Sequence, residues 1–170
     1  MRQQDKQTNI LIIYTGGTIG MVKDPVTGNL SPFDFSHIIE QVPELKSFGY
    51  NIDTITFSPL IDSSDVTPDF WIKLVHTIKD NYSNYDGFLV LHGTDTMAYT
   101  ASALSFLLEN LQKPVIFTGS QLPIGTLRTD GKENLITAIE IAATKKAEQP
   151  LVPEVAIYFE NKLYRGNRTI

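Results

Sequence analysis

Cysteine, long hydrophobic runs and blocks of basic residues are all missing from this sequence. Without cysteine the chain has no disulfide bond, no thiolate metal site and no cysteine nucleophile. Lys and Arg total 14 against 19 Asp and Glu, and the basic residues are not clustered, so we expect no nucleic-acid partner. The first nine residues are polar, and the apolar run at residues 10–14 is too short for a signal peptide or a membrane span. We therefore expect a cytoplasmic protein with no membrane contact.

The features of disordered and metal-binding proteins are absent as well. Hydrophobic residues make up 42 % and charged residues 19 % of the 170 positions, which is a globular composition, and this length suits one domain. The sequence has no internal repeat and no low-complexity tract. His37 and His76 have no partners at the spacing of metal ligands, so we expect no metal site.

Short apolar strands alternate with amphipathic helices along the chain. Strands are predicted at residues 9–14, 51–57, 87–92 and 114–119, followed by a hairpin over 154–166 that turns at Asn161–Lys162. Helices are predicted at residues 67–82, 95–111 and 129–147. This alternation predicts an α/β fold with a doubly wound, mostly parallel sheet, helices on both faces and a hairpin near the C-terminus.

The predicted helices have recognisable starts. Thr67 and Pro68 suit the N-cap and the first position of the helix at 67–82, and either Thr129 or Asp130 suits the N-cap of the helix at 129–147. The first of these helices carries an apolar stripe made of Trp71, Leu74, Val75 and Ile78.

Hydroxyls, glycines and aspartates follow the predicted strands at the point where each strand ends. The four segments are TGGTIG (15–20), SPLIDSSD (58–65), GTDTM (93–97) and TGSQLP (118–123). In parallel α/β folds ligands bind beyond the carboxyl ends of the strands. The sequence therefore predicts a small-molecule site at this edge of the sheet.

The segment YTGGTIGM (14–21) has three possible interpretations. It lacks the lysine of a phosphate-binding P-loop, and Gly16, Gly17 and Gly20 do not match the dinucleotide pattern G-x-G-x-x-G. A proline-containing loop follows it, not a helix that would hold a phosphate. A tight turn and a presented threonine nucleophile both stay open from these residues alone.

The segment HGTDTM (92–97) favours a functional interpretation. Gly93 permits a sharp exit from the strand, which places Thr94 and Asp95 where the next helix begins. Asp95 has two possible roles, as a helix cap or as a carboxylate that holds a substrate ammonium group. His92, the last strand residue, is expected to be packed and hydrogen-bonded.

Taken together, the motifs resemble those of the bacterial-type L-asparaginases, in their cytoplasmic type I branch. The resemblance runs from Ile10 to the last residue and rests on YTGGTIGM, IDSSD, HGTDTMAYTASALSF, TGSQLP and LYRGNRT. It implies that residues 1–170 are the N-terminal catalytic domain and that the family's smaller C-terminal α/β domain is absent from this chain. It also implies a homodimer or a dimer of dimers when the protein is full length.

The same resemblance assigns roles to particular residues. Thr18 corresponds to the nucleophile, and Thr94 and Asp95 to the threonine and aspartate of a Thr–Lys–Asp set. Asp95 would also hold the substrate's ammonium group, with Thr94 beside it. The loop that holds the substrate's α-groups corresponds to Asp62, Ser63 and Ser64. The implied reaction hydrolyses the side-chain amide of L-asparagine to L-aspartate and ammonia through an acyl-enzyme, with no cofactor and no metal.

Besides the absent C-terminal domain, two further features depart from the family pattern. The family's lysine would come one place beyond Ile170, and Leu30 stands at about the place of a tyrosine usual in the loop after the nucleophile. A related glutaminase or tRNA-linked amidase is one alternative, although the latter usually carries an extra N-terminal segment and the first strand here starts at about residue 9. A non-catalytic ligand-binding fragment of this fold is the other.

Overall fold

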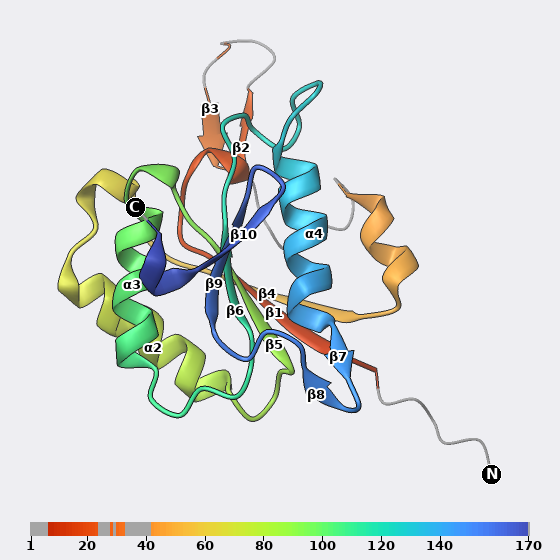
Figure 1. The fold of residues 1–170 in the computed structure, drawn as a ribbon. Coiled ribbons are helices and arrows are strands. Elements are labelled where there is room, and N and C mark those ends of the chain that lie inside the picture. The colour runs from red at the N-terminus through yellow and green to blue at the C-terminus, as the bar shows by residue number, and fades with distance from the viewer. Residues whose placement is uncertain (1–6, 24–27, 29, 33–41, 170) are drawn as a thin grey trace.

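A six-stranded sheet forms the centre of the molecule (Figure 1). The computed structural model describes residues 7–23, 28, 30–32 and 42–169. The strand order is β10-β9-β6-β5-β1-β4, and every neighbouring pair is parallel except the β9–β10 hairpin. The strands are β1 (Asn9–Tyr14), β4 (Asn51–Thr56), β5 (Gly87–Leu91), β6 (Val115–Thr118), β9 (Val155–Phe159) and β10 (Lys162–Arg165). The predicted mostly parallel sheet with a C-terminal hairpin is confirmed.

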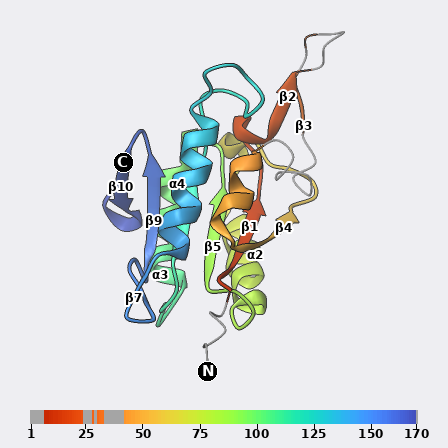
Figure 2. The same cartoon turned by 90° about the vertical axis from the view of Figure 1, so that its right-hand side faces the viewer.

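Helices cover both faces of this sheet, as predicted (Figures 1 and 2). Helices α2 (Pro68–Asn81) and α3 (Met97–Leu107) lie on one face, and α4 (Gly131–Ala143) lies on the other. Two small ribbons pair β2 (Met21–Lys23) with β3 (Leu30–Pro32) and β7 (Lys145–Lys146) with β8 (Gln149–Pro150). Short 3₁₀ helices are η1 (Thr18–Gly20), η3 (Pro43–Phe48), η4 (Ser63–Asp65), η5 (Thr94–Thr96) and η6 (Gly166–Arg168).

The central strands β1, β5 and β6 are apolar at nearly every position because they are buried on both faces. Successive side chains of a strand point to opposite sides, so Ile10 and Ile12 pack toward α4 whereas Leu11 and Ile13 pack toward α2 and α3. The stripe on α4 that meets the first set consists of Leu135, Ala138, Ile139 and Ala142. The residues that meet the second set include Leu74, Ile78, Ala101 and Leu104.

Several predicted boundaries are wrong by a few residues. Helix α3 begins at Met97 and not at residue 95, because Thr94–Thr96 form a 3₁₀ turn. Helix α4 ends at Ala143, and β7 and β8 replace the last predicted turn of helix. The C-terminal hairpin turns one residue earlier than predicted, at Glu160 and Asn161, whose φ angles are 49° and 61°. Two successive positive φ values are the geometry of a type I′ two-residue hairpin turn.

The predicted N-caps of α2 and α4 are correct in position but only partly in chemistry. Pro68 occupies the first turn of α2, whereas the Thr67 side chain makes no cap hydrogen bond. At α4 the Thr129 hydroxyl accepts a hydrogen bond from the Gly131 N–H at 2.9 Å. The neighbouring Asp130 is the N-cap by position, but its carboxylate binds another loop.

The strand order fixes where a ligand would bind. From β1 the chain crosses to β4 on one side and then returns to β5 on the other, so the direction of winding reverses between β1 and β5. In doubly wound sheets the crevice for a ligand opens at such a switch point, beyond the carboxyl ends of the strands. The segments that follow β1 and β5 are the two threonine-containing motifs at residues 15–20 and 93–97.

Candidate functional site

Two glycines bring the turn after β1 against the loops after β4 and β5. Gly16 and Gly17 have φ angles of 142° and 90°, which side chains rarely adopt. A Cβ atom on Gly16 would lie 2.1 Å from the carbonyl oxygen of Ile61, and one on Gly17 would lie 2.7 Å from the backbone nitrogen of Gly93. The turn therefore needs glycine at both positions, and it carries Thr18 to the place where the three loops meet.

The two threonines that flank these glycines have different environments. Thr15 is 2 % exposed, and its hydroxyl donates to the carbonyl oxygen of Leu91 at 2.8 Å, which ties β1 to β5. Its own carbonyl accepts the Ile61 N–H at 2.9 Å. Thr18 is half-buried, and its hydroxyl forms no hydrogen bond with any other residue in the part of the chain that the structure describes. Of the two, Thr18 has the hydroxyl that is available for chemistry.

The loop after β4 presents Ser63 to the same meeting point. Ser63 is 4 % exposed, and a Cβ atom on Gly93 would lie 2.5 Å from its Oγ. The Thr96 hydroxyl donates to the Ser63 carbonyl at 2.6 Å, which joins this loop to the one after β5. Asp62 and Ser64 are exposed and bind each other, since the Asp62 carboxylate accepts from both the N–H and the hydroxyl of Ser64 at 2.9 Å. These two hydrogen bonds lower the pKa of Asp62 and fix the turn.

Thr94 and Asp95 line a cavity of about 520 Å³. Thr94 is half-buried at its edge, and the Asp95 side chain is exposed to solvent. The walls also include Met97, Gln121, Phe159, Tyr164 and Thr169. Thr18, Ser63, Asp62 and Ser64 do not line this cavity. Their loops contact the loop that carries Thr94 and Asp95, through the close approach of Gly17 to Gly93 and the hydrogen bond of Thr96 with the Ser63 carbonyl.

His92 is packed and hydrogen-bonded, as predicted. It is 1 % exposed and lies between the rings of Phe70 and Phe117, with centroid distances of 5.7 and 6.0 Å. One ring nitrogen faces the carbonyl of Gly93 and the other faces the hydroxyl of Thr100. Burial lowers the pKa of His92, which the Gly93 hydrogen bond only partly offsets, so the ring is neutral at pH 7.

The sequence did not single out the residues that shape the loop after β6. The Asp130 carboxylate accepts the backbone N–H groups of Gln121 at 2.9 Å and of Leu122 at 3.1 Å. The Asn134 amide donates to Asp130 at 3.2 Å and to the carbonyl of Gly119 at 3.0 Å. Gln121 thereby takes its place in the cavity wall. The motif TGSQLP contained Gln121, but nothing local links it to Asp130 nine residues later.

Comparison with known proteins agrees with the motifs. The sequence profile of the family described as "Asparaginase, N-terminal" matches residues 9–170. The chain belongs to the asparaginase family.

Individual members of the asparaginase family are similar over nearly the whole chain. L-asparaginase 1 of Escherichia coli strain K12 is 48 % identical over 169 residues, which are 96 % of this chain and 47 % of that protein. The crystal structure of L-asparaginase I from Vibrio cholerae superposes with a TM-score of 0.83 at 45 % identity, covering 97 % of this chain and 48 % of that one. A glutamyl-tRNA(Gln) amidotransferase component from Thermococcus kodakarensis is 39 % identical over 146 residues, 85 % of this chain and 33 % of that protein. The chain thus spans about half the length of these two bacterial L-asparaginases.

The described part of this asparaginase-family chain holds no cluster of three or more His, Asp or Glu side chains that could bind a metal ion. Over the same residues, no helix has the length and apolar character needed to cross a membrane. His37 and Ile170, on which two of the sequence expectations rest, lie outside the described residues. Leu30 lies in β3.

Proposed function

We propose that residues 1–170 are the N-terminal catalytic domain of an L-asparaginase that hydrolyses the side-chain amide of L-asparagine to L-aspartate and ammonia. The observation that carries this proposal is the meeting of three loops at the switch point of the sheet. There the glycines beside Thr18 contact the backbone of Ile61 and Gly93, next to the cavity lined by Thr94 and Asp95. The family membership and the 48 % identity to an L-asparaginase support the choice of reaction.

Thr18 is the proposed nucleophile. Its hydroxyl oxygen attacks the amide carbon of the substrate, the C–N bond breaks, and ammonia leaves with the proton that the hydroxyl gives up. The product of this step is an aspartyl ester of Thr18, which water then cleaves to release aspartate and restore the hydroxyl. A threonine hydroxyl needs a base to lose its proton. Thr94, acting with the lysine that the resemblance places after Ile170, would assist the water that cleaves the ester.

The remaining site residues bind the substrate. The backbone N–H of Thr94 meets the negative charge that develops on the amide oxygen. The exposed carboxylate of Asp95 binds the substrate's ammonium group, and Ser63 binds its α-carboxylate. Asp62 and Ser64 belong to the same substrate loop, where their mutual hydrogen bonds hold the turn that presents Ser63. This chemistry requires no cofactor.

The assembled protein is proposed to be a cytoplasmic homodimer or dimer of dimers. The cytoplasmic assignment rests on the resemblance to the type I branch. The proposed assembly is supported by the outer face of α3, where Tyr99 is 69 % and Phe106 is 71 % exposed. Large apolar side chains on one exposed helix face are typical of surfaces that another part of a protein covers.

The similarity to an amidotransferase component supports a second candidate, a related glutaminase or tRNA-linked amidase. A non-catalytic ligand-binding domain is the third. Steady-state ammonia release from asparagine and from glutamine, measured on the complete gene product, separates the three. Asparagine is expected to be the better substrate by kcat/KM. A preference for glutamine would favour the second candidate, and release from neither amide would favour the third.

Thr18→Ala is expected to lower amide hydrolysis by several orders of magnitude, because the covalent step cannot start without the nucleophile. Thr15→Val is the matched control, since it removes the hydroxyl that donates to the Leu91 carbonyl and leaves Thr18 in place. This control is expected to lower stability by about 1–3 kcal/mol while the protein keeps its activity. Near wild-type turnover by Thr18→Ala would refute the assignment of the nucleophile.

A further inference from the structure

A chain of three polar contacts runs from the surface of α2 to the loop after β5. The indole N–H of Trp71 donates to the Thr100 hydroxyl at 3.1 Å. That hydroxyl lies 3.0 Å from Nε2 of His92, and Nδ1 of His92 lies 2.7 Å from the carbonyl oxygen of Gly93. His92 and Thr100 are both at most 1 % exposed, so water does not compete for these contacts.

The positions of the hydrogens in this chain follow from its chemistry. A carbonyl oxygen only accepts, so Nδ1 of His92 must carry the hydrogen that bonds to Gly93. The ring is neutral, so Nε2 carries no hydrogen and accepts from the Thr100 hydroxyl. The Thr100 oxygen in turn accepts from Trp71, whose indole N–H can only donate. Every polar atom of the chain is satisfied in one arrangement, with His92 in its Nδ1–H tautomer.

The Gly93 carbonyl and the Thr94 N–H belong to the same peptide group. The cis bond found among the described residues is Ser58–Pro59, so the Gly93–Thr94 peptide is trans and its carbonyl and N–H point in opposite directions. Anchoring the carbonyl therefore fixes the direction of the N–H. The Thr94 N–H forms no hydrogen bond with another described residue, and Thr94 lines the cavity.

We propose that His92 is a positioning residue, which holds the Gly93 carbonyl through its Nδ1–H and thereby directs the Thr94 N–H toward the amide oxygen of the substrate. Thr100 acts through His92 by fixing its tautomer. The inference rests on the proposed function, because it deepens the role assigned there to the Thr94 N–H. A purely apolar residue at position 92 would fill the space between Phe70 and Phe117, but it would remove the side-chain hydrogen bond to the Gly93 carbonyl and leave this peptide group held only by the 3₁₀ turn that Gly93 caps.

The expected kinetic signature is a loss in kcat with little change in KM. The amide oxygen becomes fully charged only in the transition state, so a misdirected N–H weakens the transition state more than the bound substrate. Removing an oxyanion donor outright typically costs about 10²–10³ in kcat, and misdirecting one costs less. We expect a loss of about 10- to 100-fold for Thr100→Val and for His92→Phe.

The test compares variants of the complete gene product by steady-state ammonia release from asparagine. Thr100→Val removes the hydroxyl that fixes the tautomer, whereas Thr100→Ser keeps it and is expected to restore kcat to within about 3-fold of wild type. Thr118→Val is the matched control, since it removes an equally buried hydroxyl that donates to the Tyr158 carbonyl, while the Thr118 carbonyl still accepts the His92 backbone N–H. This control is expected to lose stability but to keep kcat.

A spectroscopic measurement tests the same proposal without any activity. Nitrogen-15 NMR of the imidazole rings is expected to show the Nδ1–H tautomer for His92 in the wild type and a changed tautomer or broadened signals in Thr100→Val. This measurement also decides the matter if His92→Phe does not fold. The Nε2–H tautomer in the wild type would overturn the inference.

Different results would refute the positioning role of His92 and the proposed hydrolysis of asparagine. If the wild type hydrolyses asparagine and both Thr100→Val and His92→Phe keep its kcat, the positioning role is refuted and the proposed function stands. If the wild type releases ammonia from neither asparagine nor glutamine, the proposed function is refuted and the positioning role falls with it.

Discussion

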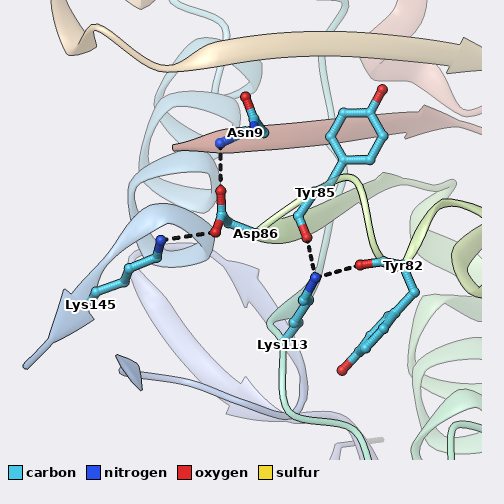
Figure 3. Close-up of polar contacts among 6 residues, drawn as sticks. All are labelled: Asn9, Tyr82, Tyr85, Asp86, Lys113 and Lys145. Atoms are coloured by element: carbon cyan, nitrogen blue, oxygen red, sulfur yellow. Dashed lines mark hydrogen bonds and ion pairs between the residues drawn. The ribbon is translucent and has the colours of Figure 1, made fainter. Parts of the chain in front are cut away.

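Lys113 is expected to stabilise the edge of the sheet opposite the candidate site, and its replacement measures how much. Its ammonium group donates to the carbonyl of Tyr85 at 2.6 Å and to the carbonyl of Tyr82, and it lies 4.7 Å above the Tyr82 ring (Figure 3). Tyr82 follows α2 and Tyr85 precedes β5, so one side chain from the loop before β6 joins two elements. Lys113→Met keeps most of the aliphatic stem and removes only the charged donor.

The expected magnitude follows from these contacts. A hydrogen bond to a charged group contributes about 1.5–3 kcal/mol, and a partly exposed cation over an aromatic ring adds about 0.5–1 kcal/mol. Part of this gain is offset because Lys113 is only partly buried and its long side chain loses rotamer freedom. We therefore expect a loss of about 2–3 kcal/mol in the free energy of unfolding, or about 5–10 °C in Tm for a chain of this length.

Urea denaturation followed by circular dichroism measures this loss, with Lys146→Met as the matched control. Lys146 is exposed in β7, so the control removes the same charge and is expected to change stability by less than about 0.5 kcal/mol. Equal stability losses in the two variants would show that net charge is responsible. A loss below about 1 kcal/mol in Lys113→Met would show that water replaces the ammonium group at both carbonyls.

Two further predictions concern the turn after β1 and the buried histidine. Gly16→Ala is expected to lower the free energy of unfolding by about 3 kcal/mol, because the added Cβ would lie 2.1 Å from the Ile61 carbonyl oxygen. Gly125→Ala is the control, since no atom lies within 4 Å of its added Cβ. The control is expected to be nearly neutral in the same denaturation assay. Because the pKa of His92 is lowered on folding, its contribution to stability is complete above the unfolded value of about 6.5 and is lost as the pH falls toward the folded value. Denaturation of wild type and His92→Phe from pH 7 down to pH 5 is expected to show a steeper loss in the wild type, and parallel curves would contradict this.

The fold was predictable because its central strands β1, β5 and β6 are buried on both faces. Continuous apolar runs such as residues 9–14 separate such strands from amphipathic helices without any knowledge of their neighbours. The order of the strands was not predictable in this way, since periodicity says nothing about which strand pairs with which. The predicted helix at 129–147 extends past the observed end of α4 for the same reason. Lys145 and Lys146 suit a helix locally, but in the structure they pair with Gln149 and Pro150 as a small β-ribbon.

The candidate site was predictable in its location but less so in its details. The rule that ligands bind beyond the carboxyl ends of parallel strands identified the loops, yet the residues alone did not distinguish Thr15 from Thr18. The distinction comes from burial, since the Thr15 hydroxyl is buried and donates a hydrogen bond to the Leu91 carbonyl. Asp130 was interpreted only as a helix cap, because its contact with Gln121 depends on how the whole loop after β6 folds.

The peptide groups around Gly93 explain why so many small residues gather at this edge of the sheet. A Cβ on Gly17 would lie 2.7 Å from the Gly93 nitrogen, and a Cβ on Gly119 would lie 2.5 Å from the His92 carbonyl oxygen, so the loop after β5 is enclosed between the loops after β1 and β6. The imidazole of His92 then holds the next peptide group by its carbonyl. A shift of this backbone would therefore move the turn that carries Thr18 and the Thr94 N–H together. The glycines set how closely the loops approach, and the buried histidine sets the orientation of the peptide between them. Substitutions at Gly17 and His92 therefore act on one shared structural unit, and their effects on stability and activity should not be additive.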